Sequence, residues 1–137
     1  GYVMMHMQGD PDNMQNNPEY DDVVESIISF FEGKMNELEI IGIRNVILDP
    51  GFGFGKTIKD NFKILKDLRL FQSFKKPLLV GLSRKSMINK LLNITPAEAL
   101  NGTTALNTIA IDKGADILRV HDAKEASECI KLMENLN

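Results

Sequence analysis

The sequence predicts a parallel α/β fold built from four consecutive βα units. Four short apolar runs of similar length and composition recur along the 137 residues, at positions 2–5, 45–48, 77–80 and 117–120. Because these runs are almost continuously apolar, they are typical of parallel strands that are covered on both faces. Helical patterns lie between the runs, and this alternation predicts a parallel sheet with right-handed crossovers. This alternation of strands and helices is compatible with both a doubly wound sheet and a barrel.

The first two helices are predicted from the spacing of their apolar residues. In the first helix, which should end near Gly42, apolar side chains recur every three or four residues and form one stripe. The stripe consists of Val24, Ile27, Ile28, Phe31, Met35 and Leu38. The second helix should run from Thr57 through Phe62 and Leu65 to Leu68.

The later helices are predicted mainly from capping residues. One helix covers residues 87–92, and another begins at residues 95–98, where a Thr, a Pro at the first helical position and a Glu can form a capping box. Residues 104–113 continue that helix or form a separate one, which Gly114 ends. Asp122, with Glu125 three residues later, can cap a last helix that runs to Leu136.

The composition is that of a globular protein. With 43% apolar and 26% charged residues, the chain should fold as one domain over residues 1–137. A net charge of -3 without a basic block predicts no nucleic-acid partner. No apolar run approaches the roughly 18 residues of a membrane span. Since Cys129 is the single cysteine and no signal-peptide pattern is present, we expect a cytoplasmic location and a buried, inert thiol.

The chain is short for a barrel. A complete (β/α)8 barrel takes about 250 residues, so four βα units would be half of one. The chain also opens almost inside a strand and has no initiator Met. We therefore expect a truncated chain.

A glycine-rich segment follows the second predicted strand, with the sequence DPGFGFGKT at residues 49–57. Glycine permits positive φ angles and close backbone approach, so such a loop can wrap a flat ligand or turn amide groups toward an anion. The glycine spacing matches neither a P-loop nor a GxGxxG motif. A plain turn between strand and helix is the alternative. The added presence of Asp49, Phe54 and Lys56 favours a ligand loop.

Cations and hydroxyls follow the third predicted strand. If the extended conformation persists, Gly81, Ser83 and Lys85 share one face by the period of two, and Arg84 lies on the other. Lys85 is therefore the better candidate for a side chain directed into a site. The alternative is a solvated lysine whose aliphatic stem covers apolar surface.

The fourth predicted strand carries Arg119 and His121 on one face. On a barrel strand this face is the interior, where a fixed guanidinium and an imidazole at the carboxyl end can bind an oxyanion such as phosphate. The helix that begins after Asp122 would strengthen the site. Alternatively, Arg119 pairs with a core carboxylate. Met5, at a Met-rich strand end, lines an apolar pocket or fills the core. No cluster of zinc-type ligands is present in the sequence.

Segments over nearly the whole chain share one family pattern. They are MHMQG at residues 5–9 with Pro11 and Met14-Gln15, DPGFGFGKT at 49–57, PLLVGLSRKSMI at 77–88, Gly102-Thr103, and RVHD at 119–122. Together they resemble the dihydropteroate synthase family, which is a sulfonamide target. The resemblance implies a (β/α)8 TIM-type barrel, of which this chain supplies the C-terminal half, strands five to eight. Asn89 departs from the family, which often has Gly there.

The resemblance also implies a reaction. The family condenses p-aminobenzoate with 6-hydroxymethyl-7,8-dihydropterin pyrophosphate, giving 7,8-dihydropteroate and pyrophosphate in folate biosynthesis. It uses Mg2+, whose main protein ligand lies in the half of the barrel absent here, so no metal ligand is expected in this chain. The family usually forms homodimers through its late helices. Without the first four strands, these 137 residues alone should have no turnover.

Site residues follow from matching the family motifs position by position. The residues implied to bind pterin are Met5, Asp49, Phe54, Gly81 and Lys85. Those implied to bind p-aminobenzoate are Ser83 and Phe54, and those implied to bind pyrophosphate are Arg119 and His121. Catalysis is implied for Arg119, His121 and Lys85. The chemistry is suitable, because a carboxylate can accept two hydrogen bonds from the 2-amino-4-oxo edge of pterin while an ammonium donates to a ring acceptor.

Two other functions fit part of the pattern. One is another pterin-binding barrel, such as a methyltetrahydrofolate methyltransferase, although the SRKS segment and the pair Arg119 and His121 argue against it. The other is a noncatalytic half-barrel that binds a ligand and dimerises to cover its open strand edges.

Overall fold

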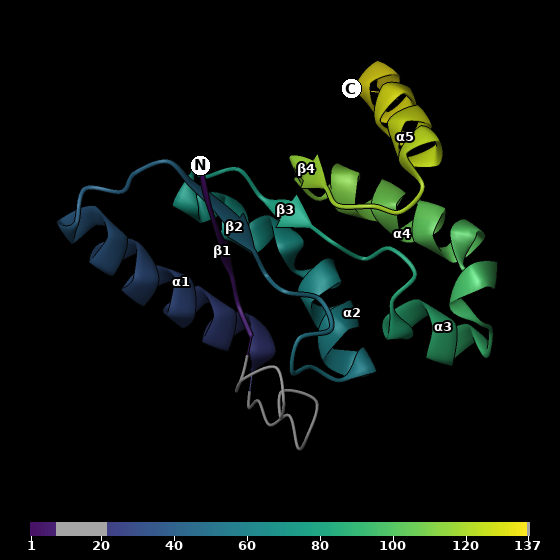
Figure 1. The fold of residues 1–137 in the computed structure, drawn as a ribbon, viewed down its shortest axis with the longest axis horizontal. Helices are drawn as coiled ribbons and strands as arrows, with labels where there is room; N and C mark the ends of the chain where they lie inside the picture. Colours follow the sequence, from purple (N-terminus) through teal and green to yellow (C-terminus); the bar gives the residue numbers. More distant parts are fainter. Residues whose placement is uncertain (8–21, 137) are drawn as a thin grey trace.

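The computed structural model describes residues 1–7 and 22–136, so the motif residues between Gln8 and Gln15 lie outside the described part. Four strands alternate with five α-helices (Figure 1). The strands are β1 (Tyr2–Met5), β2 (Val46–Asp49), β3 (Leu79–Val80) and β4 (Ile117–Leu118). The helices are α1 (Val23–Ile40), α2 (Ile58–Lys66), α3 (Ser86–Leu92), α4 (Leu100–Asp112) and α5 (Ala123–Leu136), with 3-10 helices at Leu68–Phe74 and Pro96–Glu98. Along the described ranges, none of the helices has both the length and the apolar character to cross a membrane.

The described strands are parallel, as their apolar character predicts. Strand β1 pairs with β2 from Tyr2 opposite Val46 to Met5 opposite Asp49. Strand β3 pairs with β4 at Leu79 opposite Ile117 and Val80 opposite Leu118. A single parallel bridge joins the two pairs, since the amide of Leu48 donates to Pro77 O at 2.9 Å. The order in space is therefore β1-β2-β3-β4, which is the order along the chain.

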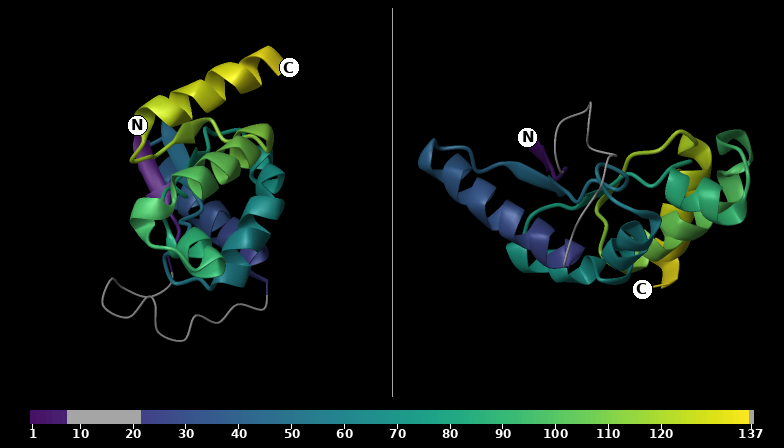
Figure 2. Two further views of the ribbon diagram at one scale, coloured as in Figure 1. Left: turned by 90° about the vertical axis from the view of Figure 1, so that its right-hand side faces the viewer. Right: turned by 90° about the horizontal axis from the view of Figure 1, so that it is seen from below.

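The core forms where the helices pack on the strands, and Figure 2 shows α1 and α2 running along one side of them. The stripe predicted for α1 is confirmed, because Val24, Ile27 and Phe31 are buried. The Phe31 ring meets Phe71 of the 3-10 helix edge to face at 5.8 Å, an arrangement typical of stable aromatic pairs. Fully burying one such ring contributes about 1.5–3 kcal/mol. This packing fixes the backbone from which the site residues project.

Capping residues set the helix ends. The Asp22 carboxylate accepts hydrogen bonds from Val24 N and Glu25 N and starts α1. Thr57 and Asp60 form a reciprocal capping box that starts α2. Each cap satisfies amides that have no partner within the helix.

Three sequence-based boundaries are wrong in part. The second helix ends at Lys66, not Leu68, because the chain tightens into a 3-10 helix. The capping box predicted at residues 95–98 forms, but it closes a single 3-10 turn, and α4 begins afterwards at Leu100. Strands β3 and β4 are two residues each, shorter than the predicted runs. Apolar content gave their positions but not the length of their pairing.

Candidate active site

The predicted site residues gather at the carboxyl ends of the four strands. Because the strands are parallel, these ends meet at one edge, where ligands bind in α/β folds. Met5 ends β1 and lies in register beside Asp49, the last residue of β2. Gly81 follows β3 directly, and Arg119 follows β4. The side chains below therefore come from segments far apart in sequence.

Asp49 is the buried acid of the site. Its side chain is 2% exposed, and it accepts a hydrogen bond from Gly51 N on Oδ1 at 2.9 Å. The other oxygen, Oδ2, accepts from Arg119 Nη2 at 2.9 Å, across 70 residues of sequence. The Arg119 side chain is half exposed. The pairing of Arg119 with a core carboxylate, one of the two sequence-based alternatives, is therefore confirmed.

The glycine-rich loop after β2 forms two consecutive turns. Phe54 N donates to Gly51 O, and Lys56 N donates to Gly53 O. Gly51 has a φ of +73°, and a Cβ there would lie 2.0 Å from His6 O. Only glycine can pass so close to the chain that leaves β1. Asn61 of α2 also holds the loop in place, because its Oδ1 accepts a hydrogen bond from Gly53 N at 2.9 Å.

Lys56 holds this loop from inside. Its side chain is buried, and Nζ donates to Gly51 O at 2.7 Å, Phe54 O at 3.1 Å and His6 O at 3.3 Å. Three carbonyl oxygens match the three N–H donors of an ammonium. Burial nevertheless lowers the pKa of Lys56 to about 7, with Asp49 opposing the change and Lys85 adding to it. Lys56 thus joins the ends of β1 and β2.

His6 is buried beside that lysine. Burial, and then the charge of Lys56, lower the pKa of the His6 imidazole to about 4. The ring meets Phe30 of α1 edge to face, with centroids 5.1 Å apart. His6 is therefore a neutral core residue at ordinary pH.

Lys85 reaches across from β3 to the glycine-rich loop. Its Nζ donates to Phe52 O at 2.7 Å and lies 5.0 Å from the centroid of the Phe54 ring. Burial lowers the pKa of Lys85, Asp49 opposes this, and Arg119 adds to it. A Cβ at Gly81 would lie 3.4 Å from Arg119 Nη1 and 3.6 Å from Lys85 Nζ. The cations of Lys85 and Arg119 therefore lie beside the backbone of Gly81, and Arg119 is in turn paired with the Asp49 carboxylate.

Arg84 points away from Lys85, as predicted, although a turn at residues 83–84 breaks the extended conformation on which that prediction depended. It adopts a φ of +54°, and its guanidinium donates two hydrogen bonds to the Asp122 carboxylate, at 2.9 and 3.0 Å. Its Nη1 donates to Pro96 O at 2.6 Å. The hydrogen bonds from Arg84 lower the pKa of the Asp122 carboxyl. The predicted capping carboxylate of α5 is thus paired with Arg84, and Asp122 starts the helix through its carbonyl, which accepts from Ala126 N.

Ser83 and His121 form the last contact of the site. Ser83 Oγ lies 2.7 Å from His121 Nδ1, and the His121 amide donates to the same Oγ at 3.2 Å. Ser83 is buried, whereas His121 is exposed. The structure thus pairs Asp49 with Arg119, Lys85 with Phe54, and Ser83 with His121.

Two residues that organise the site had no separate role in the sequence-based interpretation. Lys56 and Asn61 position the glycine-rich loop from below through hydrogen bonds to its backbone. Lys56 belongs to the glycine-rich motif, which was the one available signal. Nothing in the sequence around Asn61 distinguishes it from an ordinary helix residue, because its role depends on a contact across eight residues with Gly53.

The donor set does not form a metal site. Among residues 1–7 and 22–136, no group of three or more His, Cys, Asp or Glu side chains could hold a metal ion. The Asp49 carboxylate is flanked by the cations of Lys85 and Arg119, a setting that disfavours a divalent cation. The described residues at the strand ends do not fit Mg2+, and the magnesium requirement implied by the resemblance stays a prediction.

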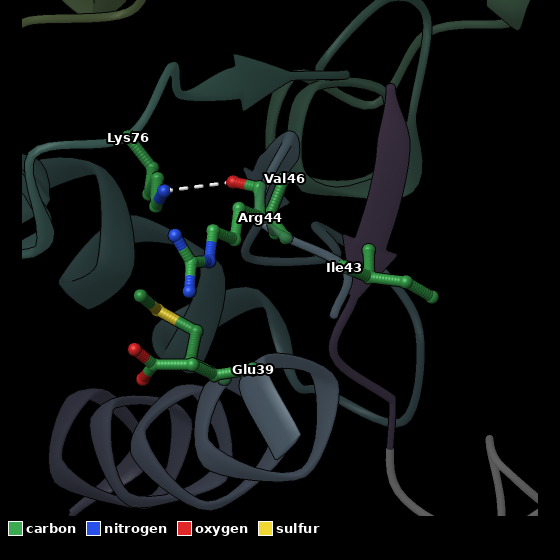
Figure 3. A pocket seen from close by; sticks show the side chains of 6 residues that line it. Glu39, Ile43, Arg44, Val46 and Lys76 are labelled. Carbon is green, nitrogen blue, oxygen red and sulfur yellow. Dashed lines mark hydrogen bonds between the residues drawn. The ribbon is translucent and has the colours of Figure 1, made fainter. Parts of the chain in front are cut away.

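A separate pocket of about 260 Å³ lies at the opposite ends of the strands (Figure 3). It is lined by Met35, Glu39, Ile43, Arg44, Val46 and Lys76. Lys76 Nζ donates to the carbonyl of Arg44, so this lysine fastens the start of β2 to the start of β3. The pocket is remote from Asp49 and is not part of the site.

The fold and site define a parallel α/β protein with a cluster of charged side chains at the carboxyl ends of its strands. Residues 1–121 match the family described as pterin binding enzyme, and the chain belongs to that family. It is 47% identical over 133 residues to the dihydropteroate synthase of Escherichia coli (strain K12), covering 96% of this chain and 47% of the relative. The chain thus spans about half the length of the curated relatives it matches.

Solved structures give the same result. A Yersinia pestis dihydropteroate synthase with a sulfonamide drug complex superposes with a TM-score of 0.95 at 45% identity, over 98% of this chain and 50% of that one. The Thermus thermophilus dihydropteroate synthase in complex with 4-aminobenzoate gives a TM-score of 0.92 at 38% identity, over 98% of this chain and 56% of that one. These neighbours imply a TIM-barrel fold and confirm the resemblance read from the motifs.

Proposed function

We propose that this chain is the C-terminal half, strands five to eight, of a dihydropteroate synthase barrel, and that the whole barrel forms 7,8-dihydropteroate from p-aminobenzoate and 6-hydroxymethyl-7,8-dihydropterin pyrophosphate. The observation that carries the proposal is the meeting of Asp49, Lys85, Arg119 and His121 at one end of four parallel strands. Similarity to named synthases along nearly the whole chain supports it.

Asp49 and Lys85 would bind the pterin edge. The Asp49 carboxylate keeps Oδ1 on the amide of Gly51, so Oδ2 is the oxygen that a ligand can reach by displacing Arg119. The guanidine-like edge of pterin offers N–H donors similar to those of an arginine, so the exchange conserves the hydrogen bond. Lys85 would donate to a ring acceptor. Met5 and the bare backbone of Gly81 would border the flat ring.

Displacement from Asp49 would free Arg119 for the anion. In the reaction, the arylamine nitrogen attacks the exocyclic methylene carbon, and the carbon–oxygen bond breaks with its electron pair going to pyrophosphate. The nitrogen then loses a proton to solvent. Negative charge grows on the departing oxygen, and Arg119 and His121 at the end of β4 would stabilise it. Positioning and stabilisation of the leaving group suffice, since a neutral arylamine is already a nucleophile.

Phe54 and Ser83 are the residues proposed for p-aminobenzoate. The Phe54 ring is half buried and faces Lys85 Nζ, so it can contact an aromatic substrate near the pterin. The Ser83 hydroxyl is occupied by His121, and a direct bond to the p-aminobenzoate carboxylate would require that contact to open. Exposed Leu132 and Leu136 on α5 support the proposed homodimer through a late helix.

The test is a synthase assay with the full-length protein that contains this chain. Formation of 7,8-dihydropteroate and release of pyrophosphate should both depend on p-aminobenzoate. Lys85→Met should lower kcat/KM by roughly 10-fold or more, because a charged hydrogen-bond donor is lost. The matched control is Lys90→Met, which removes an exposed lysine from α3 and should leave the rate unchanged.

Three outcomes would contradict parts of the proposal. Absence of product from the full-length protein would exclude a synthase, and methyl transfer from methyltetrahydrofolate would identify the other class of pterin barrel. Ligand binding without turnover would identify a binding module. Turnover by the 137-residue chain alone would contradict the claim that the first half of the barrel is required.

A further inference from the structure

The contact between Ser83 and His121 involves both the backbone amide and the ring of the histidine. Ser83 Oγ receives the backbone N–H of His121 at 3.2 Å and lies 2.7 Å from the ring nitrogen Nδ1 of the same residue. A serine hydroxyl has one proton to donate and two lone pairs that accept. The backbone amide of His121 occupies one lone pair of Ser83 Oγ. The group that accepts the hydroxyl proton therefore determines which nitrogen of the His121 ring carries a proton.

Among residues 1–7 and 22–136, that proton has one acceptor within reach. Ser83 is 4% exposed, and a buried hydroxyl rarely remains without an acceptor. Among the residues that the structure describes, His121 Nδ1 is the acceptor at hydrogen-bond distance from Ser83 Oγ. If Nδ1 instead carried the proton, Oγ would accept twice and its own proton would be left unpaired in the interior. Nδ1 of the neutral ring is therefore the acceptor.

The backbone places these two residues opposite each other. Strands β3 and β4 pair Leu79 with Ile117 and Val80 with Leu118, a separation of 38 residues. Ser83 and His121 are separated by the same 38 residues, as are Arg84 and Asp122. The same separation therefore recurs in the segments that follow the two strands, although residues 83–84 form a turn. The Arg84–Asp122 ion pair and the Ser83–His121 hydrogen bonds hold these two segments side by side.

We propose that Ser83 is a positioning residue, which holds neutral His121 in the tautomer with its proton on Nε2 and so presents an N–H donor to an oxyanion at the end of β4. A ring nitrogen that is orientated through its partner in this way is a common arrangement around bound ions. Arg119, two residues earlier, supplies the charge and His121 supplies a directed hydrogen bond. The role of His121 in binding an oxyanion rests on the proposed function, whereas its tautomer does not.

Nitrogen NMR of histidine-labelled protein tests the tautomer directly. Nδ1 and Nε2 give separate 15N signals, and the protonated and unprotonated nitrogens differ strongly in shift. The chain has two histidines, and a His121→Gln variant assigns the signals. Spectra taken at about pH 9, where an imidazole is neutral, should show protonated Nε2 and unprotonated Nδ1 for His121. Ser83→Ala should give the mixed tautomers of a free imidazole, and Ser83→Thr, which keeps the hydroxyl, should restore the single form.

The matched control is Ser73→Ala, because Ser73 is exposed and its hydroxyl donates to Leu70 O, far from the site. This variant should leave the His121 spectrum unchanged. A wild-type ring with the proton on Nδ1 would overturn the proposal, and so would a Ser83→Ala spectrum identical to that of the wild type.

Titration with inorganic pyrophosphate tests the anion-binding role of His121 separately from its tautomer. Pyrophosphate should shift the Nε2 signal, and Ser83→Ala should weaken its affinity by roughly 2- to 10-fold, the range for one neutral hydrogen bond. If the tautomer is as proposed but pyrophosphate leaves Nε2 unchanged, the positioning by Ser83 is supported and the pyrophosphate role of His121 is wrong.

Discussion

Replacing Gly51 with alanine should destabilise the protein strongly. The added Cβ would lie 2.0 Å from His6 O, a backbone atom that also accepts from Lys56, and the residue would keep a φ near +73°. A left-handed conformation costs a residue with a Cβ about 1–2 kcal/mol. Relieving the overlap by moving backbone costs roughly 1–3 kcal/mol more. The sum is a loss of about 2–5 kcal/mol in the free energy of unfolding.

Gly33 provides the matched control. It lies inside α1, and a Cβ there would meet nothing within 4 Å. Gly33→Ala should therefore stabilise the protein by about 0.5–1 kcal/mol, since alanine is the better helix former.

Urea denaturation followed by circular dichroism measures both effects. With a slope of about 2 kcal/mol/M, Gly51→Ala should lower the urea midpoint by roughly 1–2.5 M, while Gly33→Ala should raise it slightly. If Gly51→Ala lies within about 0.5 kcal/mol of the wild type, the close crossing of the two chain segments is wrong, because that value is the usual scatter of neutral substitutions.

Other perturbations test the remaining contacts of the glycine-rich loop and the outer turn. Because the folded pKa of Lys56 is about 7 and its ordinary pKa is 10.5, the unfolded chain binds more protons between these values, so the free energy of unfolding should rise with pH across this window. Between pH 7 and 10 the rise should reach on the order of 4 kcal/mol, and urea midpoints of Lys56→Met should lack it. Asn61→Ala should cost about 1–3 kcal/mol by leaving Gly53 N and Thr57 O without their side-chain partner, and an unchanged melting curve would argue against that bridge. Arg84→Gln should destabilise the protein at neutral pH, and its difference in urea midpoint from the wild type should shrink in acid, because protonation of the Asp122 carboxyl removes the ion pair from the wild type; a difference that is the same at neutral and acid pH would contradict the pair.

Periodicity predicted much of the fold because burial imposes it. The continuous apolar runs gave parallel strands in the observed positions, and the stripe on α1 gave its buried face. Pairing length could not be predicted in the same way. Strands β3 and β4 pair over two residues each, and the segment after β3 enters a turn at residues 83–84, where Arg84 has a φ of +54°.

The site was predictable in part, because charged residues follow the predicted strands directly. Lys85 contacts the glycine-rich loop and Arg84 pairs with Asp122, as predicted, but the turn at residues 83–84 shows that an extended conformation is not the reason. Partners within the site were not predictable. The pairing of Asp49 with Arg119, and of Ser83 with His121, depends on strand order and register, which a single sequence does not specify. For the same reason the buried position of Lys56 was visible only in the structure.

Binding of two ligands to two variants tests the central claim most directly. Calorimetry would compare 6-hydroxymethyl-7,8-dihydropterin with its pyrophosphate ester on the full-length protein and on its Lys85→Met and His121→Ala variants. We predict that Lys85→Met weakens both ligands, because Lys85 is proposed to bind the ring, whereas His121→Ala weakens the pyrophosphate ester alone. Equal weakening of both ligands by His121→Ala, or unchanged binding by Lys85→Met, would contradict the division of this strand-end site into a pterin part and an anion part.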